Sequence, residues 1–211
     1  MGFVSDCADN GIKAVSFGGG EPLQYPSLFN VFKRLRGKLF RSMTTNGLLL
    51  DDAIDDLVSA APNKVHISIH FPQDEREVER VTRQVNMLAS RGIKSGVNLL
   101  VARSWLEAAE QAAKHLNENG ISNERIVYLP MRQSDTPTPN EMARVAGGER
   151  FQSMTCLANC AISPRFCSLA ADKTVAWCSY TTARKQLAGL TYKDLTDALD
   201  GLGLTFCGGI N

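Results

Sequence analysis

The amino-acid sequence predicts an α/β protein with a parallel sheet, followed by a small cysteine-rich C-terminal extension. Three observations lead to this fold class. Apolar strands and amphipathic helices alternate strictly as far as residue 133, the connections between them are short, and five of the 6 cysteines lie in the last third of the chain. Such alternation is typical of parallel sheets with helical crossovers, either doubly wound or closed as a barrel.

The individual strands and helices follow from hydrophobic periodicity and from turn residues. Pro26 and Gly37 bracket one helical segment, Pro62 ends the next, and Gly92 stands at a C-cap position. The chain enters in a helix, although a parallel unit normally starts on a strand, so a first strand is missing from the pattern. The expected order is helix 3–10, strand 12–17, helix 25–37, strand 38–47, helix 48–61, strand 64–70, helix 74–92, strand 93–101, helix 105–120 and strand 125–131.

A change of pattern places a domain boundary near residues 135 to 150. Residues 136–150 are punctuated by proline and glycine, which is typical of a linker with at most a short helix. They separate a first domain, residues 1–135, from an extension, residues 151–211. In the extension we expect two short strands around a turn at Asp172-Lys173 and a terminal helix with Thr191 as its N-cap.

Composition and charge exclude several classes of protein. The formal net charge is +1 and the basic residues are scattered, so no nucleic-acid partner is expected. No apolar run approaches the roughly 20 residues of a membrane span, and the N-terminus lacks the features of a signal peptide. We therefore expect a cytoplasmic protein without a membrane partner. In that compartment crowded cysteines indicate a metal site before disulfides, whereas an oxidising compartment favours disulfides.

The carboxyl ends of the predicted strands are the candidate ligand site, because ligands of parallel α/β folds bind there. Four of the five ends are polar or rich in glycine. Glycine allows backbone groups to approach a ligand, and a neighbouring carboxylate favours a cationic group such as an ammonium. The ends are Gly18–Pro22, Thr44–Gly47, Ser68–His70, Asn98–Arg103 and Leu129–Met131.

The order of these strand ends resembles the radical S-adenosylmethionine (SAM) superfamily. A strand is followed by GGEP and a helix, the next strand ends in TNG, and the third strand ends in Ser-x-His. GGE alone is a weak motif, but the three motifs in this order are specific, and the resemblance covers residues 1 to about 133. It implies an incomplete TIM-like barrel of five to six β/α units.

The same resemblance implies which residues bind SAM. Gly19, Gly20 and Glu21 are expected to hold the methionyl amino group, and Arg103 to pair with the carboxylate. The expected contacts of the ribose, the carboxylate and the adenine come from Thr45, Asn46, Ser68, His70, Asn98 and Leu129 to Met131.

Structural interpretations compete for several of these residues. The GGE segment is also explained by a tight turn with a solvated glutamate, and Arg103 by a surface charge. His66 and His70 share one face of a strand, where a metal pair competes with a buried, hydrogen-bonded role. Cys7 is expected to be a small buried apolar residue.

One departure from the family is the missing cluster loop. The superfamily carries C-x3-C-x2-C before GGE, where three thiolates bind the catalytic [4Fe–4S] cluster. Before Gly18 this sequence has only Cys7. We therefore expect a fragment of a longer enzyme or a degenerate relative, with the catalytic cluster site absent and no activity by itself. The strand 12–17 is then an exposed sheet edge, which predicts a covering segment or a homodimer.

The extension resembles the auxiliary-cluster extensions of the same family, called SPASM or, in the shorter form, twitch. In that interpretation the ligands of an auxiliary [4Fe–4S] cluster are Cys156, Cys160, Cys167 and Cys178, with Cys207 as a substitute. Thiolates suit zinc as well as iron–sulfur clusters, so the metal stays open.

The resemblance implies a function for the complete enzyme. It would cleave SAM reductively to a deoxyadenosyl radical, which abstracts hydrogen from a peptide, a protein or a small-molecule substrate. Two alternatives remain. One is a non-catalytic partial-barrel module that binds a partner, with a structural zinc or no metal; the other is a SAM- or nucleotide-binding domain with unrelated chemistry.

Overall fold

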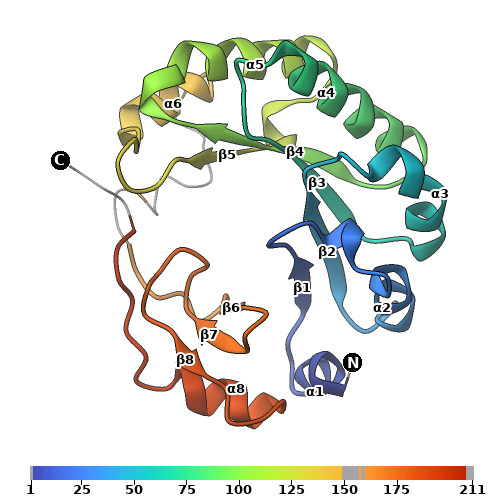
Figure 1. The fold of residues 1–211 in the computed structure, drawn as a ribbon, viewed down its shortest axis with the longest axis vertical. Coiled ribbons are helices and arrows are strands. Elements are labelled where there is room, and N and C mark those ends of the chain that lie inside the picture. The colour runs from blue at the N-terminus through green and yellow to red at the C-terminus, as the bar shows by residue number, and fades with distance from the viewer. Residues whose placement is uncertain (1, 149–156, 158–159, 208–211) are drawn as a thin grey trace.

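The computed structural model describes residues 2–148, 157 and 160–207, and its larger part is half of a barrel. Five parallel strands lie in chain order, β1-β2-β3-β4-β5, and curve around an open side (Figure 1). The predicted partial TIM-like barrel with parallel strands is therefore confirmed. The strands are β1 (Ala14–Phe17), β2 (Phe40–Thr45), β3 (Lys64–Ile69), β4 (Ser95–Val101) and β5 (Ile126–Pro130).

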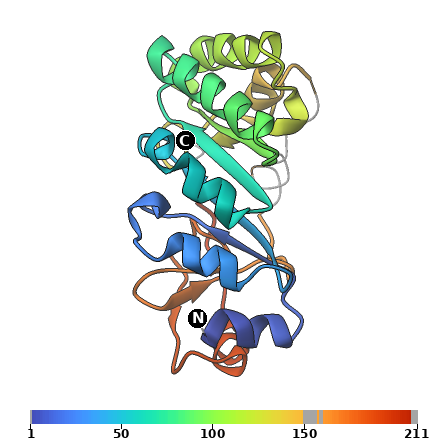
Figure 2. The same ribbon diagram turned by 90° about the vertical axis from the view of Figure 1, so that its right-hand side faces the viewer.

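The helices that connect these strands cover the convex side of the sheet. They stack in a row along that side, as Figure 2 shows when it is compared with Figure 1. They are α2 (Leu28–Arg34), α3 (Leu50–Ala60), α4 (Glu75–Ser90) and α5 (Leu106–Glu118). The helix expected over 25–37 is shorter: Tyr25 is extended and ends a separate 3-10 turn, Pro22–Gln24, and α2 covers only Leu28–Arg34.

One large hydrophobic core lies between the sheet and these helices. Every second strand residue, such as Met43, Ile67 and Leu99, is buried against helix residues such as Phe32 and Leu88. Burial of that apolar surface is the main source of stability for the half-barrel. The alternating residues of the same strands point to the open, concave side, where no such helix layer lies.

The chain after β5 forms a small separate layer. The short helix α6 (Pro139–Val145) lies within the predicted linker and starts with a capping box between Thr138 and Glu141. Beyond it, β6 (Ser168–Leu169), β7 (Thr174–Ala176) and β8 (Lys185–Gln186) form an antiparallel sheet, and α8 (Tyr192–Leu199) packs beside it.

The predicted elements of the extension are largely confirmed. β6 and β7 flank the turn at Asp172-Lys173, in which Lys173 has a φ of 64°. Thr191 caps α8 by accepting a hydrogen bond from the Asp194 backbone amide. The third strand, β8, was not predicted, because two residues without an apolar pattern carry no strand signal.

The first helix packs on the extension and not under the parallel sheet. α1 (Gly2–Asp9) contributes Cys7 to a second hydrophobic core with Val175, Leu187 and Leu195. Asp6 also accepts a hydrogen bond from the Tyr192 backbone amide at 2.5 Å. Residues far apart in sequence thus share one small core at the N-terminal edge of the half-barrel.

The extension also contacts the opposite edge of the half-barrel. The Arg132 guanidinium, just past β5, lies 4.9 Å from the centre of the Tyr180 ring. The Gln133 backbone amide donates to the Cys207 carbonyl at 3.3 Å. The extension therefore spans the open side of the half-barrel from α1 to the end of β5, as Figure 1 shows.

Two general expectations concern the surface. β1 pairs only with β2 among the described strands, and Ala14 and Ser16 are exposed, so β1 is the edge strand that was expected. A partner on this edge stays a prediction. No helix in the described ranges is long and apolar enough to cross a membrane; the cytoplasmic location stays a prediction.

Candidate functional site

The concave surface of the sheet, here called the inner face, is the candidate site. Its side chains alternate with the buried outer row and are mostly polar, and none of them is a carboxylate. A mostly polar strand surface that faces an open side is suited to a ligand, because its polar groups can bond to that ligand and its few apolar side chains can pack against it. The inner face consists of Ser16, Ser42, Thr44, Lys64, His66, Ser68, Gly96, Asn98, Leu100, Val127 and Leu129.

The glycines after β1 leave bare backbone at the rim of this face. Gly19 and Gly20 have φ angles of 74° and 51°, which glycine adopts without the strain that other residues incur. A Cβ atom built on either residue would meet nothing within 4 Å. The glycines are therefore required by the backbone conformation, and the space beside them is open to a ligand.

The carboxylate of Glu21 joins the ends of β1 and β2. Its Oε1 accepts from the Thr45 hydroxyl at 2.8 Å and from the Leu23 amide at 3.0 Å, and its Oε2 accepts from the Asn46 amide at 2.8 Å. A carboxylate offers about four acceptor positions, so three bonds leave room for one more donor. Glu21 thus shapes the rim and keeps acceptor capacity for a ligand ammonium.

The TNG turn is clamped from the outer side by α4. The Gln84 amide donates to the Gly47 carbonyl at 2.8 Å, and the Arg80 guanidinium donates to the Asn46 carbonyl at 3.0 Å. A Cβ atom on Gly47 would lie 2.4 Å from Gln84 Oε1. Neither α4 residue was predicted from the sequence. The available signal was the position of Gln84, a polar residue at helical spacing from Val81 and Leu88 on the mostly apolar face of that helix.

Thr45 and Thr44 have different positions. Thr45 is buried on the outer side, where its hydroxyl also accepts from the Gly47 amide at 3.0 Å. Thr44 lies on the inner face beside His66. The structure therefore gives Thr45 a role in holding the turn, and Thr44 is the threonine of this strand end that faces the open side.

Ser68 and Asn98 are brought together as neighbours on β3 and β4. They are paired in register on the inner face, and the Asn98 amide donates to the Thr44 hydroxyl at 3.4 Å. Ser68 is buried and Asn98 is half-buried. Three adjacent strands thus contribute two hydroxyls, of Thr44 and Ser68, and the amide of Asn98 to one patch.

His66 lies at the base of this patch. The pKa of its imidazole is lowered to about 4, first by burial and then by the positive charge of Lys64, while the Asn98 side chain opposes the shift. The imidazole is therefore neutral near pH 7. Within the described residues, its buried Nε2 atom has no hydrogen-bond partner. The choice between a buried structural role and a metal pair with His70 stays a prediction.

The remaining predicted SAM residues lie at the rim of the barrel. His70 is exposed, and its backbone amide donates to Glu77 at 3.2 Å. Arg103 pairs with Glu141, with 3.5 Å between Nε and Oε2. The Met131 amide donates to the Val101 carbonyl at 2.7 Å, which extends β5 beyond Pro130. Of these three residues, only Arg103 already has an ionic partner.

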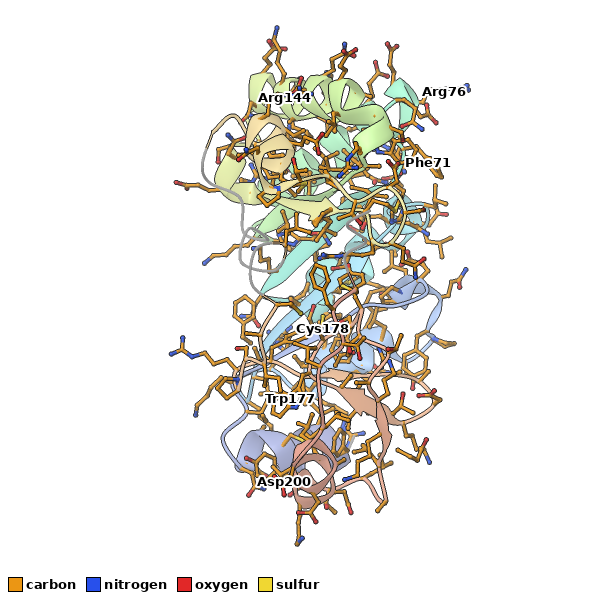
Figure 3. The ribbon with its side chains drawn as sticks, turned by 90° about the vertical axis from the view of Figure 1, so that its left-hand side faces the viewer. Phe71, Arg76, Arg144, Trp177, Cys178 and Asp200 are labelled. Atoms are coloured by element: carbon orange, nitrogen blue, oxygen red, sulfur yellow. The ribbon has the colours of Figure 1, made fainter. Side chains whose placement is uncertain are left out.

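The predicted metal ligands are not gathered in the part of the chain that is described. Cys160 is exposed, Cys167, Cys178 and Cys207 are half-buried, and Cys156 lies outside the described residues. No group of three His, Cys, Asp or Glu side chains in the described ranges is arranged to hold a metal ion. Figure 3 shows Cys178 at mid-height of the molecule, next to Trp177. The auxiliary ligand set stays a prediction.

Cys7 has the predicted buried position. Its pKa rises to about 11, first because of burial, then because of the charges of Asp6 and Cys167. The thiol belongs to the core shared by α1 and the extension. Cys7 lies on α1, before β1, whereas Gly19 and Gly20 follow β1. It is not part of the inner face.

Comparison with protein families identifies the half-barrel. The model of the Radical SAM superfamily matches residues 4–135. A probable GTP 3',8-cyclase of Methanococcus vannielii is 26% identical over 138 residues, which are 61% of this chain and 46% of the relative. The GTP 3',8-cyclase of Chlorobaculum tepidum is 36% identical over 108 residues, which are 46% of this chain and 33% of the relative. The matches thus span less than half the length of these relatives.

Solved structures share the fold. Streptococcus suis SuiB bound to S-adenosylmethionine has a TM-score of 0.62 at 13% identity, covering 84% of this chain and 52% of that chain. Native anSMEcpe with bound AdoMet and a Kp18Cys peptide has a TM-score of 0.62 at 16% identity, covering 92% and 70%. At these identities the likeness establishes the fold alone.

Proposed function

We propose that the rim and inner face of the half-barrel bind S-adenosylmethionine, because the chain belongs to the radical SAM superfamily. The observation that carries the proposal is the Glu21 carboxylate, which joins two strand ends beside an open glycine backbone. SAM and an iron–sulfur cluster are the cofactors of this family. The match over residues 4–135 covers every residue proposed to bind SAM. It covers none of the tail cysteines.

Each part of the site has a chemical task in this proposal. The free acceptor position of Glu21 and the bare backbone of Gly19 and Gly20 receive the ammonium of the methionyl group. Ser68 and Asn98 supply hydroxyl and amide groups for the ribose and carboxylate oxygens. In a complete enzyme, bound SAM would supply radical chemistry once an electron from a [4Fe–4S] cluster cleaved it; the groups of this chain would bind and orient SAM.

The residues present do not fit the catalytic cluster of the family. Three thiolates are needed, and Cys7 is the one cysteine before residue 156. Its buried thiol, with a pKa of about 11, is directed into the core shared with the extension. We therefore propose that this chain alone binds SAM without cleaving it. SAM cleavage above background, after reconstitution with iron and sulfide, would contradict this part.

The extension is proposed to carry an auxiliary metal site. Five cysteines within 52 residues support this proposal, since residues 156–207 contain Cys156, Cys160, Cys167, Cys178 and Cys207. Metal analysis and the visible spectrum of the purified chain separate an iron–sulfur cluster from zinc. A colourless chain with less than about 0.1 equivalent of either metal would refute the proposal, on the stoichiometry expected of a structural site.

SAM binding is tested by calorimetry on the purified chain. Replacing Asn98 with alanine removes one hydrogen-bonding group, so the dissociation constant should rise about tenfold. Asn86→Ala, on the outer side of α4, is the matched control and should leave it unchanged. Absence of saturable SAM binding by the unmodified chain, or equal affinities of the two variants, would refute the proposed site.

A non-catalytic binding module is the second candidate function. The observation that favours it is the single cysteine before residue 156, because a chain without a catalytic cluster can still present a half-barrel to a partner. A chain that binds structural zinc and fails to bind SAM would establish this alternative over the first.

A further inference from the structure

The edge of the sheet at which the five parallel strands begin, here called the strand-start edge, carries a row of cations. It lies opposite the carboxyl ends that form the proposed SAM site. The Phe40 amide donates to the Lys13 carbonyl at 2.9 Å, and the Val65 amide donates to the Lys94 carbonyl at 2.9 Å, so neighbouring strand starts lie side by side. Each strand begins at a basic residue or within two residues of one, and these residues are Lys13, Lys38, Lys64, Lys94 and Arg125.

A hollow of about 420 Å³ lies at this edge, beside the starts of β3, β4 and β5. Lys64, Lys94 and Arg125 line it, and Glu124 is the one carboxylate among its described lining residues. The Arg125 Nε and Nη2 atoms donate to the carbonyl and the hydroxyl of Ser95 at 3.0 and 3.1 Å, and Nη1 donates to a backbone carbonyl after α5 at 3.2 Å. These acceptors are neutral, so they fix the guanidinium without removing its charge.

The cations of the row have no carboxylate partner in the part of the chain that the structure describes. The ion pairs found there lie elsewhere, and none of them includes a member of the row. On the outer helices, by contrast, Arg83 is paired with Asp51 and Arg144 with Glu110. Basic residues that are scattered along the sequence are thus gathered into one uncompensated positive arc, which attracts a negatively charged partner.

The surroundings of the row discriminate between anionic ligands. Compact phosphate groups are usually held by helix N-termini and their backbone N–H groups, whereas this edge receives helix C-termini such as the end of α4 at Ser90, with partial negative charge. Single-stranded nucleic acid stacks on several aromatic side chains, and Phe40 is the one exposed aromatic residue at a described strand start. Single negative charges spaced along an extended polypeptide fit the row better than either.

We propose that the strand-start edge is a docking surface for an acidic, extended segment of a partner protein. Neighbouring strands are about 4.8 Å apart, so five strand starts extend over roughly 20 Å, which about six residues of extended chain cover. Carboxylates of the segment face the row of cations, and an apolar side chain packs on Phe40, which is 44% exposed. The surface does not overlap the proposed SAM site, so either proposal can fail without the other.

Fluorescence anisotropy with a labelled peptide tests the docking surface. The probe is a peptide of about twelve residues, glutamates with one central leucine, in about 50 mM salt, where screening is weak. Lys64→Gln combined with Lys94→Gln should weaken binding about tenfold, because each exposed ion pair contributes a factor of a few. Lys114→Gln combined with Lys193→Gln removes the same charge from α5 and α8 and should change the affinity by less than about twofold.

Two results would overturn the proposal at this stage. They are the absence of saturable peptide binding by the unmodified chain, and equal weakening by the two double variants. If the Lys64 and Lys94 double variant does not fold, Lys94→Gln alone decides, since Lys94 is exposed. It should weaken binding about threefold, and an unchanged affinity would contradict the docking surface.

Two competitors test the class of the ligand. A single-stranded oligothymidine of the same charge should bind more weakly than the peptide, and about 5 mM inorganic phosphate at constant ionic strength should leave the peptide bound. Tighter binding of the oligonucleotide, dependent on Lys64 and Lys94, would replace the acidic segment by nucleic acid. Displacement of the peptide by phosphate would show that the hollow takes a compact anion, and would overturn the proposal as well.

Discussion

The two faces of the parallel sheet differ sharply, although the same five strands build both. The outer row, with Met43, Ile67 and Leu99, is apolar and buried under helices. The inner row, with Thr44, His66 and Asn98, is polar and half-buried. Since side chains alternate along a strand, each strand carries one face packed against the helices and one face toward the open side. A residue of the first face is therefore expected to affect mainly stability, and a residue of the second face mainly the proposed binding.

The largest expected effect comes from a pair of neighbours on β4. Leu99 is fully buried on the outer face, and Leu100 is half-buried on the inner face. Leu99→Ala should lower the free energy of unfolding by about 3 kcal/mol, and Leu100→Ala by about 1 kcal/mol, because the first leaves a cavity in the core. Urea unfolding measures both, and equal losses would invalidate the distinction between the faces.

The buried imidazole predicts an acid-sensitive contribution to stability. The pKa of His66 is lowered to about 4 in the folded chain. This pKa is lower than that of histidine in the unfolded chain. The contribution of the neutral imidazole to the free energy of unfolding is therefore fully present above about pH 6.5 and is lost as the pH falls through 4. The loss should reach at most about 3 kcal/mol, and His66→Phe should reduce it. Urea midpoints at pH 7 and pH 4.5 measure the difference, with His115→Phe as the control.

The clamp on the TNG turn predicts a difference in stability between substitutions at two glycines. Gly47 and Gly120 both have a φ near 80°, but only a Cβ on Gly47 would meet neighbours, at 2.4 Å from Gln84 Oε1. Gly120→Ala should cost about 1 kcal/mol from backbone strain, and Gly47→Ala about 2 kcal/mol more from overpacking. Thermal unfolding compares them. Equal costs would show that the turn is not held tightly from the outer face.

The smallest effect concerns the reactivity of one buried and one exposed thiol. The pKa of Cys7 is about 11 and the side chain is buried, whereas Cys160 is exposed. At pH 8 iodoacetamide should modify Cys160 at least about tenfold faster than Cys7, because the thiolate is the reactive form. Peptide mass spectrometry over time measures both rates. Comparable rates would contradict the packing of α1 on the extension.

Much of the fold could be predicted from local patterns. Strand and helix alternation placed all five parallel strands, and glycines such as Gly37 and Gly92 marked the helix ends. Local signals also marked the turn at Asp172-Lys173 and the Thr191 cap. These features depend on residues close together in the chain, where backbone preference and hydrophobic period act directly.

The site was predictable only in part. Glu21, Ser68 and Asn98 could be placed at neighbouring strand ends, because strand ends of parallel sheets meet at one edge, and their contacts with SAM stay a prediction. Arg80 and Gln84 were missed, because they reach the TNG turn from a helix more than thirty residues away. Cys7 could be predicted as buried, but its partners in the extension depend on contacts between the two ends of the chain.

The sequence by itself determined the alternation of strands and helices, the glycine rim beside Glu21 and the number of cysteines, because each is local or a matter of composition. Only the tertiary structure decided which threonine of the TNG strand faces the open side, that His66 lies over Gly96, and that α1 packs on the extension. Those features depend on strand register and on contacts across long sequence separations, which side-chain packing selects after the local elements have formed.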